Sequence, residues 1–137
     1  SMAARWPDMA GDIAARKHAL HDDIKEMDSA FRAFFDDLSE RQVLESHPVY
    51  QYLDQAYLGH MKSLHWEPDQ APPPKEWAAL EALLDADASP LMIWEGAPLP
   101  ETAKRLADLG VEIVVLRPMG NADISTPLFK ALADQVR

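Results

Sequence analysis

Four short apolar runs in this sequence are each followed by ionisable residues. His47 follows the first run, His65 and Glu67 close the second, Glu95 follows the third and Arg117 follows the fourth. Imidazole is a good ligand for zinc, manganese and other transition metals, so His47 is a candidate metal ligand. The alternative interpretation of His47 is a capping or hydrogen-bonded histidine, because strand ends are wet and polar residues belong there.

The other candidates for chemistry carry weaker signals. Glu67 and Glu95 could approach one another, but spacing alone does not show an acid/base pair. His18 and His21 lie three residues apart, which could chelate a metal on a helix, yet no carboxylate or cysteine pattern fixes a site there. We expect both to be exposed, and we expect His60, which follows a glycine, to face solvent in a turn.

Composition and charge argue against several classes of protein. The formal net charge is −10 and the basic residues are scattered, which argues against nucleic-acid binding. Cysteine is absent, so neither a disulfide nor a thiolate metal site is possible. The sequence has no nucleophile elbow, no phosphate-cradling glycine loop and no apolar stretch that could span a bilayer. We therefore do not expect an enzyme.

A long amphipathic helix is predicted from Met9 to Leu38, where apolar residues recur at spacings of three and four. About 30 residues at 1.5 Å per residue extend about 45 Å. This is longer than a domain of 137 residues needs for its own packing. We therefore expect the helix to link or brace another part of a larger protein.

After Leu38, short apolar runs alternate with helical segments, and proline or glycine marks the boundaries. The alternation predicts an α/β fold, a three-layer domain with about four parallel strands flanked by helices. We expect residues 111–116, the most β-branched run, to be central and buried. The expected strands are 42–46, 61–66, 91–94 and 111–116. The expected helices are 48–57, 74–87 and 100–109, followed by a last helix capped by Thr126. We expect Gly110 to close the third of these helices in a left-handed conformation.

Ligands of parallel α/β sheets bind at the carboxyl ends of the strands. The residues that follow the four runs should therefore share one edge of the sheet. We expect that edge to be the binding surface, formed by His47, His65, Glu67, Glu95 and Arg117.

The segments around these residues resemble a known family. The run Ser46 to Leu53, which reads Ser-His-Pro-Val-Tyr-Gln-Tyr-Leu, is similar to the Ser-His-Pro-aromatic segment of periplasmic zinc receptors of the cluster A-I class. Trp66 to Pro68, Met92 to Glu95 and Val114 to Gly120 match further family motifs in the same order and at the same intervals. The resemblance covers residues 40–136 well, whereas the long helix matches the family's backbone helix in character more than in motif.

The resemblance implies that the chain is half of a clamshell receptor for zinc or manganese. Residues 1–38 would be the connecting helix and residues 39–137 the C-terminal α/β lobe, with the N-terminal lobe missing. Family members hold one metal ion between two lobes, with two histidine ligands from the first lobe and two ligands from the second. His47 would be the imidazole ligand of the C-terminal lobe, and the other rim residues would line the cleft in roles that stay open.

The resemblance also implies partners and a location. The receptor would deliver metal to the membrane subunits of an ABC importer, in the periplasm or another extracytoplasmic compartment. We interpret Ser1-Met2 as an expression remnant and expect a signal peptide upstream in the natural protein. Without the N-terminal lobe, the long helix could also bury its apolar stripe against another copy, as a homodimer.

Arg117 departs from the family pattern, in which an aspartate occupies this position in a Leu-Asp-Pro-Leu-Gly motif. A divalent cation near His47 would face this permanent positive charge and the positive end of the helix expected to begin at Pro48. We therefore expect the chain alone to bind zinc weakly or not at all. We also expect Arg117 to pair with Glu95 or Glu67, since a guanidinium at a sheet edge seeks a carboxylate.

Two other hypotheses stay open from the sequence. The chain could be a degenerate receptor lobe in which Arg117 recruits an anionic ligand, or which serves as an interaction domain. It could also be an unrelated small α/β enzyme, which a cleft without an activated nucleophile or a perturbed acid would make untenable.

Overall fold

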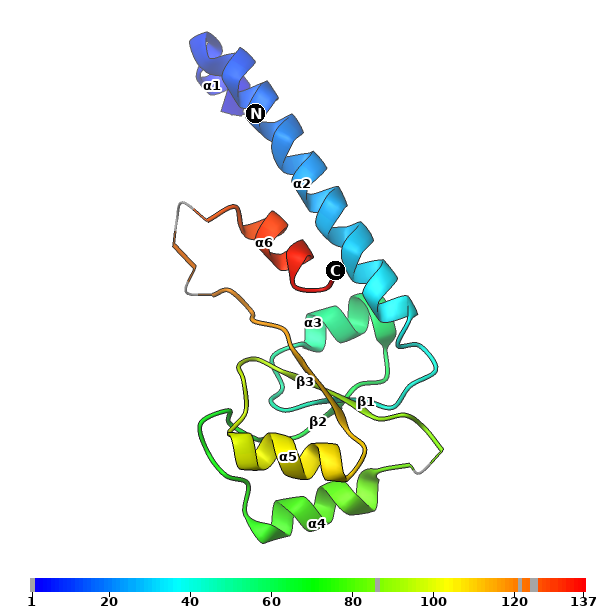
Figure 1. Cartoon of the computed structure of the whole chain (residues 1–137). Helices are drawn as coiled ribbons and strands as arrows, with labels where there is room; N and C mark the ends of the chain where they lie inside the picture. Colours follow the sequence, from blue (N-terminus) through cyan, green and yellow to red (C-terminus); the bar gives the residue numbers. More distant parts are fainter. Residues whose placement is uncertain (1, 86, 121, 124–125) are drawn as a thin grey trace.

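A four-stranded parallel sheet forms the centre of the molecule. The computed structural model describes residues 2–85, 87–120, 122–123 and 126–137. Over these residues the strand order is β2-β1-β3-β4, and each neighbouring pair is parallel. Helices cover both faces of the sheet, so the predicted three-layer α/β fold is confirmed (Figure 1). The strands are β1 (Val43–Glu45), β2 (Lys62–Ser63), β3 (Leu91–Trp94) and β4 (Glu112–Val115).

One face of the sheet packs against the long helix α2 (Ala10–Asp36), the short helix α3 (Gln51–Leu53), its π-helical continuation η2 (Asp54–Leu58) and α6 (Leu128–Asp134). Alternate strand residues point to this face because side chains of a strand alternate between the two sides of a sheet. The buried cluster on this side consists of Phe31, Phe35, Leu38, Val43, Tyr50, Leu91, Ile93 and Leu116.

The opposite face is covered by α4 (Pro74–Leu83) and α5 (Pro100–Asp108). Three tryptophans meet there: the ring centroid of Trp66 lies 4.7 Å from that of Trp77 and 6.3 Å from that of Trp94. The buried cluster also contains Leu44, Leu80, Met92, Leu106 and Val111.

The long helix extends well beyond the sheet. Its last turns are held by Phe31 and Phe35 in the core, whereas its first part, preceded by α1 (Met2–Arg5) and a 3-10 turn (Pro7–Met9), projects away from the other elements (Figure 1). Leu20 and Ile24 on this part are 48% and 37% exposed. An apolar stripe that is buried at one end and exposed at the other agrees with a helix that continues past its own domain.

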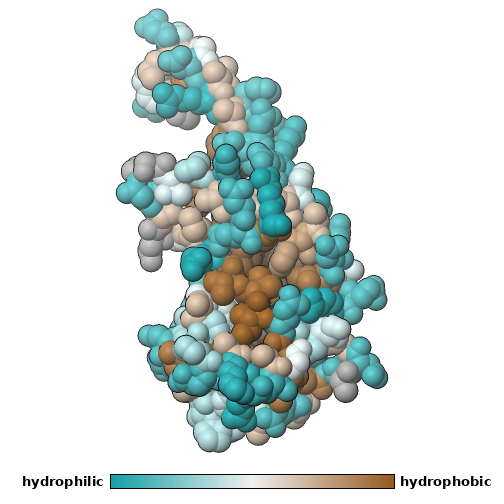
Figure 2. Space-filling view, viewed as in Figure 1, coloured by the Kyte–Doolittle hydropathy of each residue, from teal (hydrophilic) through white to brown (hydrophobic). Residues whose placement is uncertain are grey.

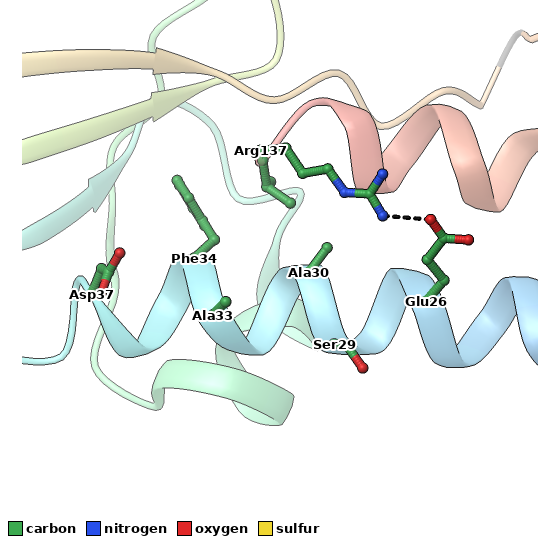
Figure 3. Close-up of a pocket in the computed structure, with 8 residues that line it drawn as sticks. Glu26, Ser29, Ala30, Ala33, Phe34, Asp37 and Arg137 are labelled. Atoms are coloured by element: carbon green, nitrogen blue, oxygen red, sulfur yellow. Dashed lines mark hydrogen bonds and ion pairs between the residues drawn. The ribbon is translucent and has the colours of Figure 1, made fainter.

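The C-terminal helix α6 lies along α2 (Figure 1). A hollow of about 630 Å³ lies between α2 and the residues that follow α6. Across this hollow, the guanidinium of Arg137 contacts the carboxylate of Glu26, with Nη2 and Oε1 2.6 Å apart (Figure 3). The hydrogen bond and the charge of Arg137 lower the pKa of Glu26 below its usual value. This ion pair joins residues 111 positions apart in the chain.

The prediction that residues 111–116 form a central strand is wrong, because β4 is the edge strand next to β3. Its residues are partly exposed, whereas all four residues of β3 are buried. β-Branched residues favour any pleated surface that is at least half covered, so they indicate a strand but not its position in the sheet. The central positions belong to β1 and β3.

Two helix starts also differ from prediction. The helix after His47 begins at Gln51 rather than at Pro48, and the last helix has Pro127 rather than Thr126 at its N-cap, without a side-chain cap. The predicted left-handed residue Gly110 is confirmed, with φ +76°. Proline fixes φ but does not require the following residues to be helical, so helix starts are the least certain part of such a prediction.

Replacing Phe31 with alanine should remove a core side chain that is 2% exposed. We expect Phe31→Ala to lower the free energy of unfolding by about 3–5 kcal/mol, through lost burial and the cavity left behind. Leu20→Ala, on the same helix and 48% exposed, should change it by less than about 0.5 kcal/mol. Urea denaturation followed by circular dichroism measures both, and equal losses would contradict the boundary between the packed and projecting parts of α2.

Candidate metal site at the carboxyl edge of the sheet

All four strands end at the same edge of the sheet because they are parallel. Neighbouring strands lie about 4.8 Å apart, so the residues after them form a row in the order of the strands. Along this row, which we call the rim, His65 and Glu67 follow β2, His47 follows β1, Glu95 follows β3 and Arg117 follows β4. The five residues therefore follow strand ends at one edge of the sheet, and their roles in a binding site stay predictions.

His47 and Glu67 meet at one end of the rim. Nε2 of His47 lies 3.3 Å from Oε1 of Glu67, and the two side chains are 33% and 44% exposed. The His65 ring is edge-on to the His47 ring, with centroids 6.1 Å apart. A neutral or charged imidazole can donate to the carboxylate at this distance, and a shared cation could replace the proton.

Backbone hydrogen bonds fix the position of His47. Ser46 N–H donates to the Ile93 carbonyl at 2.9 Å, and Trp66 N–H donates to the Ser46 carbonyl at 2.7 Å. The chain therefore stays tied to both neighbouring strands up to the residue before His47. Within the described part of the chain, Nδ1 of His47 is buried without a hydrogen-bond partner, so Nε2 is the ring atom accessible to a ligand.

A buried carboxylate lies under this end of the rim. Glu45 is only 2% exposed, and it accepts hydrogen bonds from Tyr50 N–H at 3.1 Å and from the Ser63 hydroxyl. These bonds tie β1 to the segment after His47 and to β2. Sequence reasoning missed Glu45; the only available signal was an acidic residue inside an apolar strand, where it must find donors.

Tyr50 connects the two ends of the rim. Its hydroxyl donates to the carbonyl of Leu116, the residue before Arg117. Burial raises the pKa of the Tyr50 hydroxyl far above its usual value, and the nearby charges of Glu95 and Glu45 raise it further. The hydroxyl therefore stays protonated at neutral pH and keeps its hydrogen bond.

Glu95 and Arg117 line a shallow hollow of about 520 Å³ at the other end of the rim. The side chain of Gln135 holds the backbone of Arg117 on both sides: Arg117 N–H donates to Gln135 Oε1 at 2.6 Å, and Gln135 Nε2 donates to the Arg117 carbonyl at 3.3 Å. The other lining residues are Val49, Pro118, Met119, Gly120 and Ala122.

Apolar side chains gather over the middle of the molecule on the face that Figure 2 shows.

The predicted ion pair of Arg117 with Glu95 or Glu67 is not formed over the residues that the structure describes. Glu67 contacts His47 instead, at the opposite end of the rim. Glu95 lines the same hollow as Arg117, but without an ion pair between them. The backbone of Arg117 is held by the side chain of Gln135.

The rim supplies a pair of potential metal ligands rather than a complete set. Among the described residues, no group of three or more histidine, aspartate or glutamate side chains could hold a metal ion. His18, His21 and His60 are exposed, as predicted. Nε2 of His18 lies 3.6 Å from Oδ2 of Asp22 on α2. A two-residue pair needs further ligands from elsewhere to bind a transition metal tightly.

The positive end of the helix that follows His47 lies farther from His47 than predicted, so its effect on a bound cation is weaker. Because α3 begins at Gln51, its first turn starts four residues after His47. The partial positive charge of a helix end decays within about one turn, and α3 with η2 is short. Arg117 is therefore the more relevant positive charge on the rim.

Solved structures share this fold. The zinc-bound ZnuA-like domain of AdcA from Streptococcus pneumoniae superposes with a TM-score of 0.71 at 16% identity, over 97% of this chain and 54% of that one. The metal-dependent lipoprotein YcdH from Bacillus subtilis gives 0.71 at 17% identity, over 97% and 54%. The periplasmic zinc-binding protein TroA from Treponema pallidum gives 0.59 at 16% identity, over 98% and 55%.

The family model described as zinc-uptake complex component A, periplasmic, matches residues 1–135. The chain therefore belongs to this family, as its motifs predicted. It spans about half the length of the structures that it resembles, 54% of each of the first two. No curated protein sequence matches it significantly. Over the described residues, none of the helices combines the length and the hydropathy that crossing a membrane requires.

Tyr50→Phe should show how strongly the two ends of the rim are joined. Tyr50 is 2% exposed, and the variant leaves the Leu116 carbonyl without its donor, so we expect a loss of about 1–3 kcal/mol in the free energy of unfolding at neutral pH.

The same variant has an expected pH dependence. Because the folded-state pKa of Tyr50 is raised, its contribution is fully present below the unfolded pKa of about 10 and is lost as pH rises towards the folded value. The stability difference between wild type and Tyr50→Phe should therefore shrink above about pH 10. Denaturant curves at several pH values measure it, and a constant difference up to pH 11 would contradict the assignment.

Proposed function

We propose that this chain is the C-terminal half of a two-lobed receptor that binds zinc or manganese. In this proposal residues 1–38 are the connecting helix and residues 39–137 the C-terminal lobe. Membership of the zinc-uptake family, the coverage of about half of longer relatives and the projecting part of α2 support this division. The exposed apolar side chains Leu20 and Ile24 then pack against the first lobe, or, in its absence, against a second copy as a homodimer.

His47 is the metal ligand that this lobe contributes. The observation that carries the proposal is the exposed Nε2 of His47, held by β1 at the rim and 3.3 Å from a carboxylate. Imidazole with carboxylate suits zinc and manganese, and two ligands from the N-terminal lobe would complete a four-coordinate site. In this proposal, His65, whose ring is edge-on to that of His47, and Glu95, which lines the hollow beside Arg117, face the cleft between the lobes.

Arg117 occupies the position at which the family pattern has its acidic ligand. A permanent positive charge on the rim repels a divalent cation and cannot ligate it. The affinity of the receptor then depends on the remaining ligands, and the metal sits closer to the His47 end of the rim than to Arg117.

The receptor's partners in this proposal are the membrane subunits of an ABC importer, to which it delivers metal in the periplasm or another extracytoplasmic compartment. The family description, a periplasmic component of zinc uptake, supports both the role and the location. The same description favours a binding role over catalysis, and the acidic charge of −10 disfavours nucleic acid as a partner.

A second candidate function rests on the hollow beside Arg117. In a degenerate lobe, this guanidinium would recruit a small anionic ligand, because it lines an open hollow with no ion-pair partner among the described residues. Glu95 lines the same hollow and its negative charge disfavours an anion there, so we rank this function second.

The isolated chain should bind zinc with a dissociation constant weaker than about 1 μM, because it supplies too few ligands for a tight site. Isothermal titration calorimetry with zinc chloride measures it, with His47→Ala to identify heat that comes from other surface groups. A submicromolar constant that His47→Ala abolishes would contradict the two-lobed arrangement.

In the full-length receptor, Arg117→Asp should raise zinc affinity about tenfold or more, because it removes a repulsive charge and adds a carboxylate. Arg117→Gln removes the charge alone and should give a smaller gain. His47→Ala should lower affinity strongly. If all three variants bind zinc like wild type, the metal role fails and the anionic-ligand function becomes the better one.

A further inference from the structure

The contact between His47 and Glu67 has the geometry of two ligands on one metal ion. Zinc binds imidazole nitrogen at 2.0–2.1 Å and carboxylate oxygen at 2.0–2.2 Å, so in a tetrahedral site the two atoms lie about 3.4 Å apart. Nε2 of His47 and Oε1 of Glu67 are 3.3 Å apart. The two atoms therefore need little movement to receive a cation between them.

From this geometry we propose that Glu67 is the carboxylate ligand of this lobe, in place of the acid that Arg117 has replaced. The inference rests on the proposed function, because it requires that His47 binds metal. The carboxylate ligand would then follow β2 rather than β4, and β2 lies on the other side of β1 from β3 and β4.

The strand order favours Glu67 over the other acid on the rim. β2 and β3 both neighbour β1, but Glu95, after β3, lines the hollow of Arg117 and adds its negative charge to the surroundings of Tyr50. Glu67 instead faces His47. β4 is two strand spacings from β1, about 10 Å, so a metal held at the His47 and Glu67 end lies away from the Arg117 charge.

The backbone of Glu67 is well positioned for this role. The residue before it, Trp66, is 2% exposed and packs against Trp77 and Trp94. The residue after it, Pro68, approaches Gly96 so closely that a Cβ added there would lie 3.4 Å from the proline ring. The backbone around Glu67 is therefore packed on both sides while its side chain, 44% exposed, reaches solvent. Preorganised ligands lose less entropy on binding.

Zinc chloride titrated into the 137-residue chain tests the inference, with the affinity of each variant measured by calorimetry and binding at His47, where it is present, followed by NMR of its ring nitrogens. Glu67→Gln is the informative variant, because glutamine can still accept a hydrogen bond from His47 but is a poor metal ligand. Loss of an outer-shell partner weakens metal sites about 10–100-fold, so loss of a direct ligand should weaken zinc binding by at least about tenfold. Glu40→Gln, an exposed acid in the connection between α2 and β1, removes the same charge at the opposite edge and should leave the affinity unchanged.

The possible outcomes separate this inference from the proposed function. Weaker zinc binding in both His47→Ala and Glu67→Gln, with Glu40→Gln like wild type, is the expected result. If His47→Ala abolishes binding and Glu67→Gln does not change it, the carboxylate role is overturned and the receptor proposal stands. If wild type shows no zinc-dependent change at His47 up to about 1 mM, this inference is overturned, whereas the receptor proposal is decided in the two-lobed protein. Zinc binding that is unaffected in His47→Ala also overturns this inference, because the zinc then binds other surface groups.

Discussion

The parallel pairing of β1 with both β2 and β3 is the constraint on which the rest of this structure depends. Leu44 pairs with Lys62 on one side and with Met92 on the other, and this register delivers three strand ends to one edge. The hydrogen bonds continue past the strands, because Ser46 still bonds to Ile93 and Trp66 still bonds to Ser46. His47 therefore leaves a fully paired central strand, which is why a short loop can hold an exposed imidazole in a defined place.

The charges on the rim are divided between its two ends. The imidazole of His47 and the carboxylate of Glu67 occupy one end, and the Arg117 guanidinium occupies the other, with Glu95 between them in strand order. A cation is attracted to the first end and repelled by the second. A site for a divalent metal is compatible with Arg117 on this rim only because the ligand pair and the arginine follow strands that are not adjacent.

Buried polar contacts link these two ends beneath the surface. Glu45 accepts hydrogen bonds from Tyr50 N–H and the Ser63 hydroxyl, and the Tyr50 hydroxyl donates to the carbonyl before Arg117. A buried carboxylate is costly unless its acceptors are satisfied, so these contacts specify one arrangement of the loops. The Tyr50 hydroxyl thus joins the segment after His47 to the residue before Arg117.

The sequence by itself determined the alternation of strands and helices, the extent of β3 and α2 within about two residues, and the set of residues at the rim. These follow from local periodicity and from the rule that parallel strands end together. Strand order is different, because it depends on how the connecting helices pack, and no local pattern records it. For this reason only the tertiary structure decided that β4 is an edge strand, that Glu45 is buried, and that Glu67 rather than Arg117 finds a partner on the rim.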